Sequence, residues 1–302
     1  MMSAKTKPGL LVAPLTPFDS QLKVNYTQLN DQIDYVVNDC KAAMVIAAGV
    51  EAKEYHYLSM QERRELIQKT IELVGGRCSV GVGVSHASYK TSIELAQFAE
   101  KSGAQALQVL APLRPFGGVA TIDEIIAYYE LIAKETSLPI ILYLNAGPGA
   151  DLTVPQTIEL AKLDRIKMIK ESSRDLSRVS QLIEKIQHGG IAQYFTTMQM
   201  LLITLQLGGA GATMPPPAAE LANKVIEAFE AGDMNEAARL QRQFTLFPST
   251  WMHRGLTPTM KQAMRYLNRD IGEPYPPFGR FTEQEVSALV AHLKTLDLKP
   301  KN

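Results

Sequence analysis

The sequence predicts a (β/α)8 (TIM) barrel, an α/β fold, with a C-terminal helical extension. Eight short apolar runs alternate with amphipathic stretches at intervals of about 20–37 residues. Eight parallel strands, each followed by a helix, typically close into a barrel within about 250 residues. The predicted strands are Gly9–Ala13, Ala42–Ala48, Ser79–Val84, Ala106–Leu110, Pro139–Leu144, Arg165–Lys170, Ile191–Phe195 and Ala210–Met214.

Helix start signals support this alternation. Three intervening segments begin with a capping box, at Ser59…Glu62, Thr121…Glu124 and Thr153…Gln156. The competing architecture is an open doubly wound sheet that binds a dinucleotide. The nearest match to its fingerprint, Gly81-Val82-Gly83, lacks the third glycine. The closed barrel is therefore preferred.

The pattern changes after the eighth strand. Residues 218–302 show helical spacing and no convincing strand. We therefore divide the chain into 1–217, the barrel core, and 218–302, the last barrel helix and the extension. The helical segments expected there are Ala218–Ala231, Met234–Phe247, Thr257–Leu267 and one that opens with the box Thr282…Glu285.

Composition narrows the classes of partner. The 302 residues are 46% hydrophobic, and 31 basic residues balance 31 acidic ones, so no basic field would recruit nucleic acid or an anionic membrane. No apolar run approaches the roughly 18 residues that span a bilayer. Cys40 and Cys78 lack metal spacing, and the five histidines are scattered. We expect a reduced, cytoplasmic protein without a metal or cofactor.

Lys170 is the strongest candidate for chemistry. It ends the run Arg165–Lys170, and period-two alternation puts Ile166, Met168 and Lys170 on one strand face. Barrel active sites lie at the carboxyl ends of strands. An amine among apolar groups loses solvation as a cation, so its pKa falls and it can attack a carbonyl. The plainer interpretation is a surface lysine paired with Glu171.

Tyr143 is the best partner for such an amine. Imine formation moves protons in both the addition and the dehydration steps, so it needs a proton shuttle. Tyr143 lies near the end of the fifth predicted strand, next to the strand of Lys170. The plainer interpretation is a core tyrosine whose hydroxyl is satisfied locally.

Five motifs occur in order along nearly the whole chain. They are Ala13-Pro14-Leu15-Thr16-Pro17-Phe18, Tyr143 on the fifth strand, Ile169-Lys170-Glu171-Ser172-Ser173, Leu207-Gly208-Gly209-Ala210-Gly211, and Gly232-Asp233 followed by Ala237 and Leu240. On these motifs the chain resembles the dihydrodipicolinate synthase / N-acetylneuraminate lyase family of pyruvate-dependent class I aldolases. The resemblance implies a Schiff base at Lys170, Tyr143 as general acid/base, and a homodimer or homotetramer.

The chain departs from the family where a second substrate would bind. The family's G-x-x-G-E is replaced by Gly49-Val50-Glu51-Ala52-Lys53-Glu54, with Glu54 at the glutamate position, and the two threonines of the synthases are absent. Pro112-Leu113-Arg114 stands where a tyrosine is expected. Asn145-Ala146-Gly147-Pro148-Gly149 replaces the loop that carries an arginine in the synthases, and Phe195-Thr196-Thr197-Met198 replaces S-G-D-D. These losses predict a poor dihydrodipicolinate synthase.

The predicted function is a Schiff-base-forming lyase that acts on a small 2-oxo acid, pyruvate or a sugar-derived keto acid. Glu51 either changes the second-substrate pocket or belongs to a surface turn, and Arg114 is either a carboxylate clamp or a solvated loop residue. The alternatives are a hydro-lyase like 5-dehydro-4-deoxyglucarate dehydratase and a non-catalytic metabolite-binding barrel. The substrate-binding candidates are Ala48, Gly49, Glu51, Ala52, Arg114, Asn145, Thr196 and Thr213.

Overall fold

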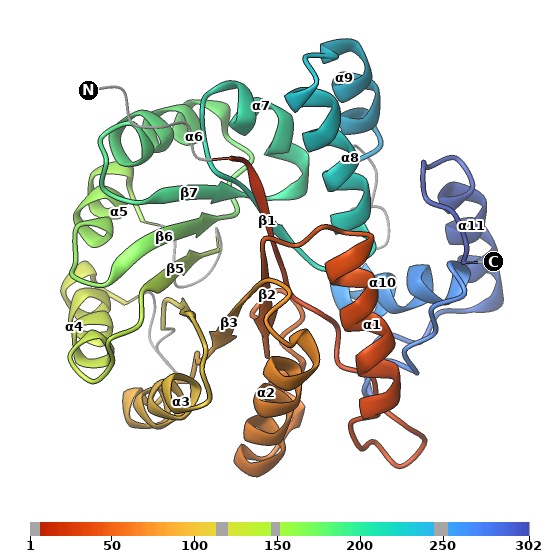
Figure 1. The fold of residues 1–302 in the computed structure, drawn as a ribbon, viewed down its shortest axis with the longest axis horizontal. Coiled ribbons are helices and arrows are strands. Elements are labelled where there is room, and N and C mark those ends of the chain that lie inside the picture. Colours follow the sequence, from red (N-terminus) through yellow and green to blue (C-terminus); the bar gives the residue numbers. More distant parts are fainter. Residues whose placement is uncertain (1–6, 113–119, 146–151, 245–252, 302) are drawn as a thin grey trace. The chain divides into compact units, whose positions relative to one another are not determined.

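The structure is a computed structural model that describes residues 7–112, 120–145, 152–244 and 253–301 (Figure 1). Eight strands form a closed parallel barrel in sequence order, which confirms the predicted fold class. The strands are β1 Gly9–Val12, β2 Met44–Ala47, β3 Ser79–Gly83, β4 Ala106–Leu110, β5 Ile140–Leu144, β6 Ile166–Glu171, β7 Gln193–Thr196 and β8 Gly211–Met214. All eight predicted runs are strands, and β6 and β7 each extend one residue beyond their run.

Helices follow the strands as the sequence predicts. The α-helices are α1 Tyr26–Asn38, α2 Met60–Val74, α3 Tyr89–Lys101, α4 Ile122–Ala133, α5 Val154–Ala161, α6 Leu176–Leu182, α7 Leu201–Gln206, α8 Ala218–Glu230, α9 Met234–Arg242, α10 Leu256–Tyr266 and α11 Glu283–Leu293. Shorter turns are η1 Glu54–Tyr57, the π-helical η2 Ile183–Gln187 and η3 Met198–Met200.

Local sequence signals explain several helix ends. The capping boxes at Ser59, Thr121, Thr153 and Thr282 all form, and each hydroxyl accepts the N–H three residues later. Helix α9 ends at Arg242, earlier than predicted, because Phe244 N–H turns back to the Gln241 carbonyl in a tighter turn.

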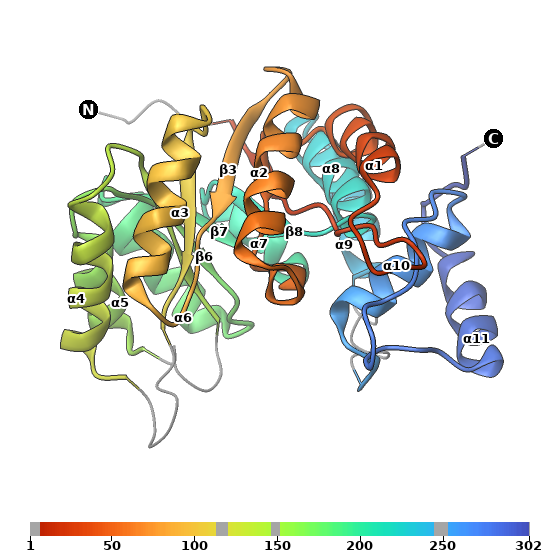
Figure 2. The same cartoon turned by 90° about the horizontal axis from the view of Figure 1, so that it is seen from below.

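The chain forms two compact units. Unit 1 consists of Met1–Gly9 with Ser79–Thr213, and unit 2 of Leu10–Cys78 with Met214–Asn302. In unit 1, strands β5 to β7 lie side by side, and α4, α5 and α6 run along one side of them (Figure 1). In unit 2, α1 and α8 lie side by side (Figure 2), and the Tyr35 hydroxyl of α1 donates to Glu220 of α8 at 2.6 Å.

The register of unit 1 sorts its side chains between two faces. Tyr143 pairs with Lys170, and Lys170 with Phe195. Neighbours in register project from the same face of a parallel sheet, and the next residue projects from the other. Lys170 and Tyr143 therefore share one face. Glu171 projects from the opposite face, toward Arg178 of α6, so the face of Lys170 is the barrel interior.

Candidate active site

Lys170 and Tyr143 meet inside unit 1. Lys170 is 3% exposed and Tyr143 is 6% exposed. Lys170 Nζ donates to the Tyr143 hydroxyl at 2.7 Å and lies 4.1 Å from the centre of the tyrosine ring. The plainer interpretation of Lys170, a surface lysine paired with Glu171, is therefore wrong. A buried amine in contact with a phenol has the arrangement that proton transfer during imine formation requires.

Ser172 completes the surroundings of the amine. Lys170 Nζ also donates to Ser172 Oγ. The sequence analysis did not select Ser172, although the period-two count that selected Lys170 continues to it through Ile166, Met168 and Lys170. The serine hydroxyl can accept from the amine or donate to an oxygen that forms beside it.

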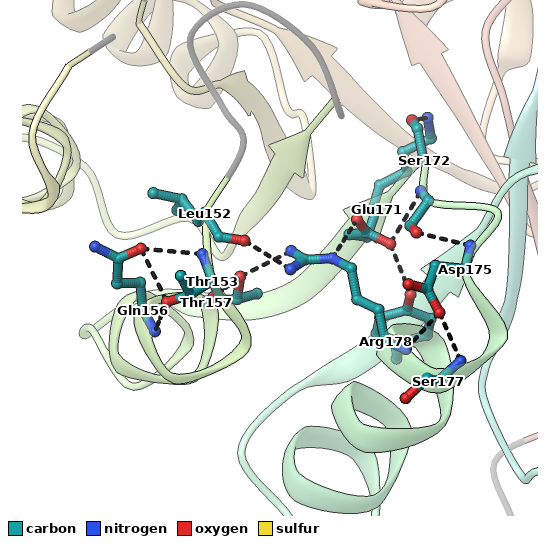
Figure 3. A network of polar contacts seen from close by, with 12 residues as sticks. Leu152, Thr153, Gln156, Thr157, Glu171, Ser172, Asp175, Ser177 and Arg178 are labelled. Atoms are coloured by element: carbon teal, nitrogen blue, oxygen red, sulfur yellow. Dashed lines mark hydrogen bonds and ion pairs between the residues drawn. The ribbon is translucent and has the colours of Figure 1, made fainter.

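Behind Lys170, a buried ion pair fixes the end of β6 (Figure 3). Glu171 is 1% exposed, and its carboxylate receives Arg178 Nε at 3.0 Å, the Tyr194 hydroxyl at 3.0 Å and Ser173 N–H at 3.1 Å. These three donors share the charge of a buried carboxylate. The turn that carries Ser172 is thus tied to α6 and β7. Burial and the neighbouring carboxylate raise the pKa of Tyr194, so its hydroxyl stays protonated and donates.

Arg178 extends this network to the segment that follows Tyr143. Its other two nitrogens donate to the Leu152 carbonyl at 2.6 Å and to Thr157 Oγ1 at 3.0 Å. Leu152 precedes Thr153, the N-cap of α5 (Figure 3). Asp175, which caps α6 by accepting from Ser177 and Arg178 N–H, fixes the start of the helix that supplies the arginine. One guanidinium therefore connects β6, α6 and α5.

Two threonines of unit 1 differ in their orientation. The hydroxyls of Thr196 and Thr213 are both buried and have no hydrogen-bond partner among the described residues. Phe195 pairs with Gly211, so Thr213, two residues further, shares the face of Lys170. Thr196 follows Phe195 and shares the opposite face with Glu171. Thr213 is therefore the hydroxyl that this register directs into the barrel.

The loop that follows β2, residues 48–54, is called the strand-two loop and belongs to unit 2. Its backbone has little conformational freedom. Ala48 and Lys53 have positive φ angles of 49° and 55°, which L-residues adopt rarely. Gly49 is buried, and a Cβ there would lie 2.6 Å from Ala13 Cβ, so only glycine fits. Ala52 is also buried, whereas Glu51 is partly exposed.

Of two further candidates, one borders residues that the structure does not describe and the other is among them. Asn145 is exposed and ends the described segment after β5. Arg114 lies outside the described residues. In the described part of the chain, no group of three or more His, Cys, Asp or Glu side chains could hold a metal ion. None of the described helices is long and apolar enough to cross a membrane.

Comparisons of the sequence with known proteins identify a family. A sequence model of the dihydrodipicolinate synthetase family matches residues 6–296. The 4-hydroxy-tetrahydrodipicolinate synthases of Desulforudis audaxviator and Moorella thermoacetica are each 28% identical over 295 residues, which cover 96% of this chain and 97% and 98% of theirs.

Solved structures support the fold. A prophage protein of the dihydrodipicolinic acid synthase family from E. coli K12, in complex with pyruvate, superposes with a TM-score of 0.87 at 22% identity, covering 96% of this chain and 99% of its own. The N-acetylneuraminate lyase of Mycoplasma synoviae gives 0.83 at 22% identity, covering 97% and 98%. The family match, over nearly the whole length, confirms the resemblance: this chain belongs to the dihydrodipicolinate synthetase family as a divergent lyase of the aldolase type.

Proposed function

We propose that this chain forms an imine between Lys170 Nζ and the carbonyl carbon of a small 2-oxo acid. The 2.7 Å contact between Lys170 Nζ and the Tyr143 hydroxyl, both buried, carries the proposal. The amine adds to the carbonyl carbon, and Tyr143 relays one N–H proton to the carbonyl oxygen, which gives a carbinolamine. Tyr143 then relays the second N–H proton to the same oxygen, which leaves as water. Ser172, also in contact with Nζ, can hold that oxygen as it leaves.

The substrate's carboxylate needs donors that do not carry a competing negative charge. Backbone N–H groups of the strand-two loop, Ala48, Gly49, Glu51 and Ala52, are the proposed donors, and the strained backbone there would preorganise them. The side chain of Glu51 would repel a carboxylate, so we assign only its backbone to this role. Thr213 is the proposed hydroxyl donor from β8, and we assign no direct contact to Thr196.

Borohydride trapping tests the proposal directly. Pyruvate and a panel of hydroxylated 2-oxo acids are each incubated with the protein and borohydride, and the adduct is located by peptide mapping. We expect the added mass on Lys170 and its loss in Lys170→Met. Lys167, exposed on the same strand, is an internal control for non-specific reaction. An adduct on Lys167 alone, or no adduct across the panel, would contradict the proposal.

The reaction that follows the imine is proposed to differ from that of the synthases. Asn145-Ala146-Gly147-Pro148-Gly149 offers no arginine for the carboxylate of a second substrate. Losing such a charge-assisted contact costs about 1.5–3 kcal/mol. We expect kcat/KM with pyruvate and aspartate semialdehyde to fall below about 10⁴ M⁻¹s⁻¹, the low end of ordinary enzymes. A larger value would contradict this, and Arg114→Ala would then test whether Arg114 replaces the missing arginine.

A single-substrate dehydration is the second candidate reaction. It starts from the same imine and needs no second carboxylate site, which fits the loop without arginine. Release of water from a deoxy-keto-sugar acid without consumption of an aldehyde would distinguish it.

Light scattering in solution would test the homodimer or homotetramer implied by the family.

A further inference from the structure

Helix α10 of the C-terminal extension contacts the strand-two loop, residues 48–54, at two points one helical turn apart. Thr257 Oγ1 donates to the Ala52 carbonyl at 2.9 Å. Lys261 Nζ lies 2.8 Å from Glu54 Oε1, and both side chains are 1% exposed. Residues four apart lie on one helix face, so a single face of α10 grips both ends of the segment 52–54. All these residues belong to unit 2.

The same lysine also fixes the loop that follows β1. Lys261 Nζ donates to the Thr16 carbonyl at 2.7 Å and to the Glu273 carbonyl at 3.2 Å. Thr16 N–H in turn donates to Glu54 Oε2 at 2.6 Å. The ammonium thus donates to the carbonyls of Thr16 and Glu273 and forms an ion pair with the carboxylate of Glu54. Two loops distant in sequence share one buried cation.

This arrangement is costly, which argues for a role beyond stability. A buried ion pair loses solvation on both sides and is often no more stabilising than an apolar pair of the same volume. Burial raises the pKa of the Glu54 carboxyl, even though Lys261 and the Thr16 N–H act to lower it. The positive φ angles of Ala48 and Lys53 add strain at both ends of the segment 49–52. Such strain persists only where surrounding contacts enforce it.

We propose that Lys261 and Thr257 are positioning residues, which hold the strand-two loop in the conformation that presents its backbone N–H groups to the carboxylate of the substrate. This inference rests on the proposed function, because it assigns that loop to the carboxylate. The C-terminal helical extension then contributes to substrate binding by fixing the conformation of this loop. Both residues act through the loop and not on Lys170 or Tyr143, so their loss is expected to weaken substrate binding more than the chemical step.

The variants are chosen so that none of them contains a buried charged group without its oppositely charged partner. Thr257→Val removes one hydroxyl at nearly constant volume. The double variant Glu54→Gln/Lys261→Met removes both charges of the pair together. Thr70→Val is the matched control, because Thr70 is a buried helical threonine of the same unit whose hydroxyl serves only the Leu66 carbonyl in the contacts described.

The readout is the rate of borohydride-trapped adduct formation against pyruvate concentration. In Thr257→Val and the double variant, a loop N–H that is no longer held in place loses its hydrogen bond to the charged carboxylate of pyruvate. The half-saturating concentration should therefore rise about tenfold or more. The limiting rate should change by no more than about twofold, since Lys170 and Tyr143 remain in place. Thr70→Val should behave as the wild type.

Amide hydrogen exchange across residues 48–54 gives a second readout that does not depend on chemistry. Faster exchange in Thr257→Val, but not in Thr70→Val, is expected. Unchanged exchange and unchanged half-saturation in folded variants would overturn the clamp while leaving the imine intact. A wild type that gives no adduct would refute the proposed function and, with it, the role in carboxylate binding. A fall in the limiting rate alone would also overturn it, by placing these residues in the chemistry.

Discussion

Two lysines are buried among the residues that the structure describes, and their partners differ. In unit 1, Lys170 is 3% exposed and donates to the hydroxyls of Tyr143 and Ser172. In unit 2, Lys261 is 1% exposed and faces the Glu54 carboxylate and two backbone carbonyls. A carboxylate stabilises the ammonium ion, which has no lone pair for attack on a carbonyl. A hydroxyl can accept from or donate to the same nitrogen.

Burial alone therefore does not mark a nucleophile. Lys170 lies at the end of β6 beside two hydroxyl groups, which can both donate and accept a hydrogen bond. Lys261 lies on α10 beside a carboxylate and two carbonyls, which accept hydrogen bonds. The first arrangement suits a reaction and the second suits a fixed connection between segments. Substitutions at the two lysines and at their partners therefore test whether the partner decides the role of a buried amine.

The largest expected effect follows the removal of the proton-exchanging partner. Tyr143→Phe keeps the ring beside Lys170 and deletes its hydroxyl. General acid/base groups contribute about 10²–10⁴-fold to rate, so trapped adduct should form slower by that factor. Stopped reactions sampled over time measure it. An unchanged rate in a variant of unchanged thermal stability would reduce Tyr143 to a packing residue.

A comparable effect, on stability rather than rate, is expected at the other lysine. Lys261→Met leaves the Glu54 carboxylate buried without its cation, which costs about 3–5 kcal/mol. Urea denaturation at neutral pH measures the loss. The double variant Glu54→Gln/Lys261→Met should recover most of it, because no charge is then unpaired. If the single variant were as stable as the double one, Lys261 would not be neutralising Glu54.

The smallest effect is expected at a third lysine, on the surface. Lys23 lies 2.8 Å from Glu62, the distance found at Lys261, but its side chain is 67% exposed. The bond from Lys23, helped by Ser59, lowers the pKa of Glu62 to about 2, against about 4.3 unfolded. The stabilisation is therefore complete above about pH 4.3 and disappears as pH falls through about 2. Because Lys23 is exposed to solvent, screening keeps this stabilisation small.

Glu62→Gln isolates this charge, because glutamine can still complete the capping box. Thermal midpoints of the variant and the wild type should differ slightly at pH 7 and converge at about pH 2. A difference that stays constant over this range would assign the effect to the helix cap rather than to Lys23.

The sequence predicted the parts of this structure that have short-range signals. Strands with apolar runs, helices with capping boxes and the pair Lys170–Tyr143 all follow from periodicity and from the order of strands in a barrel. Ser172 could have been found by the same count. The register that separates Thr213 from Thr196 depends on how strands align with their neighbours, which periodicity within one strand does not fix.

The contacts that sequence reasoning missed are of longer range. Glu171 has Lys170 and Ser172 as chain neighbours, yet its cation is Arg178, seven residues on, because alternation turns it toward α6. The pair of Glu54 and Lys261 has no local signal, since each is an ordinary charged residue of a loop or helix. Only the folded packing of unit 2 reveals that both are buried.

The contacts between α10 and the strand-two loop also determine when this loop can reach its final structure during translation. Unit 1 is nearly continuous, whereas unit 2 joins Leu10–Cys78 to Met214–Asn302. While a ribosome is still translating the middle of the chain, Thr16 and Glu54 are already made but Lys261 does not yet exist. Domains form as their segments leave the ribosome. The loop therefore acquires its contacts with α10 only near the end of translation. A nascent chain that stalls before α10 is made carries Lys170 and Tyr143 but lacks the partners of Ala52 and Glu54.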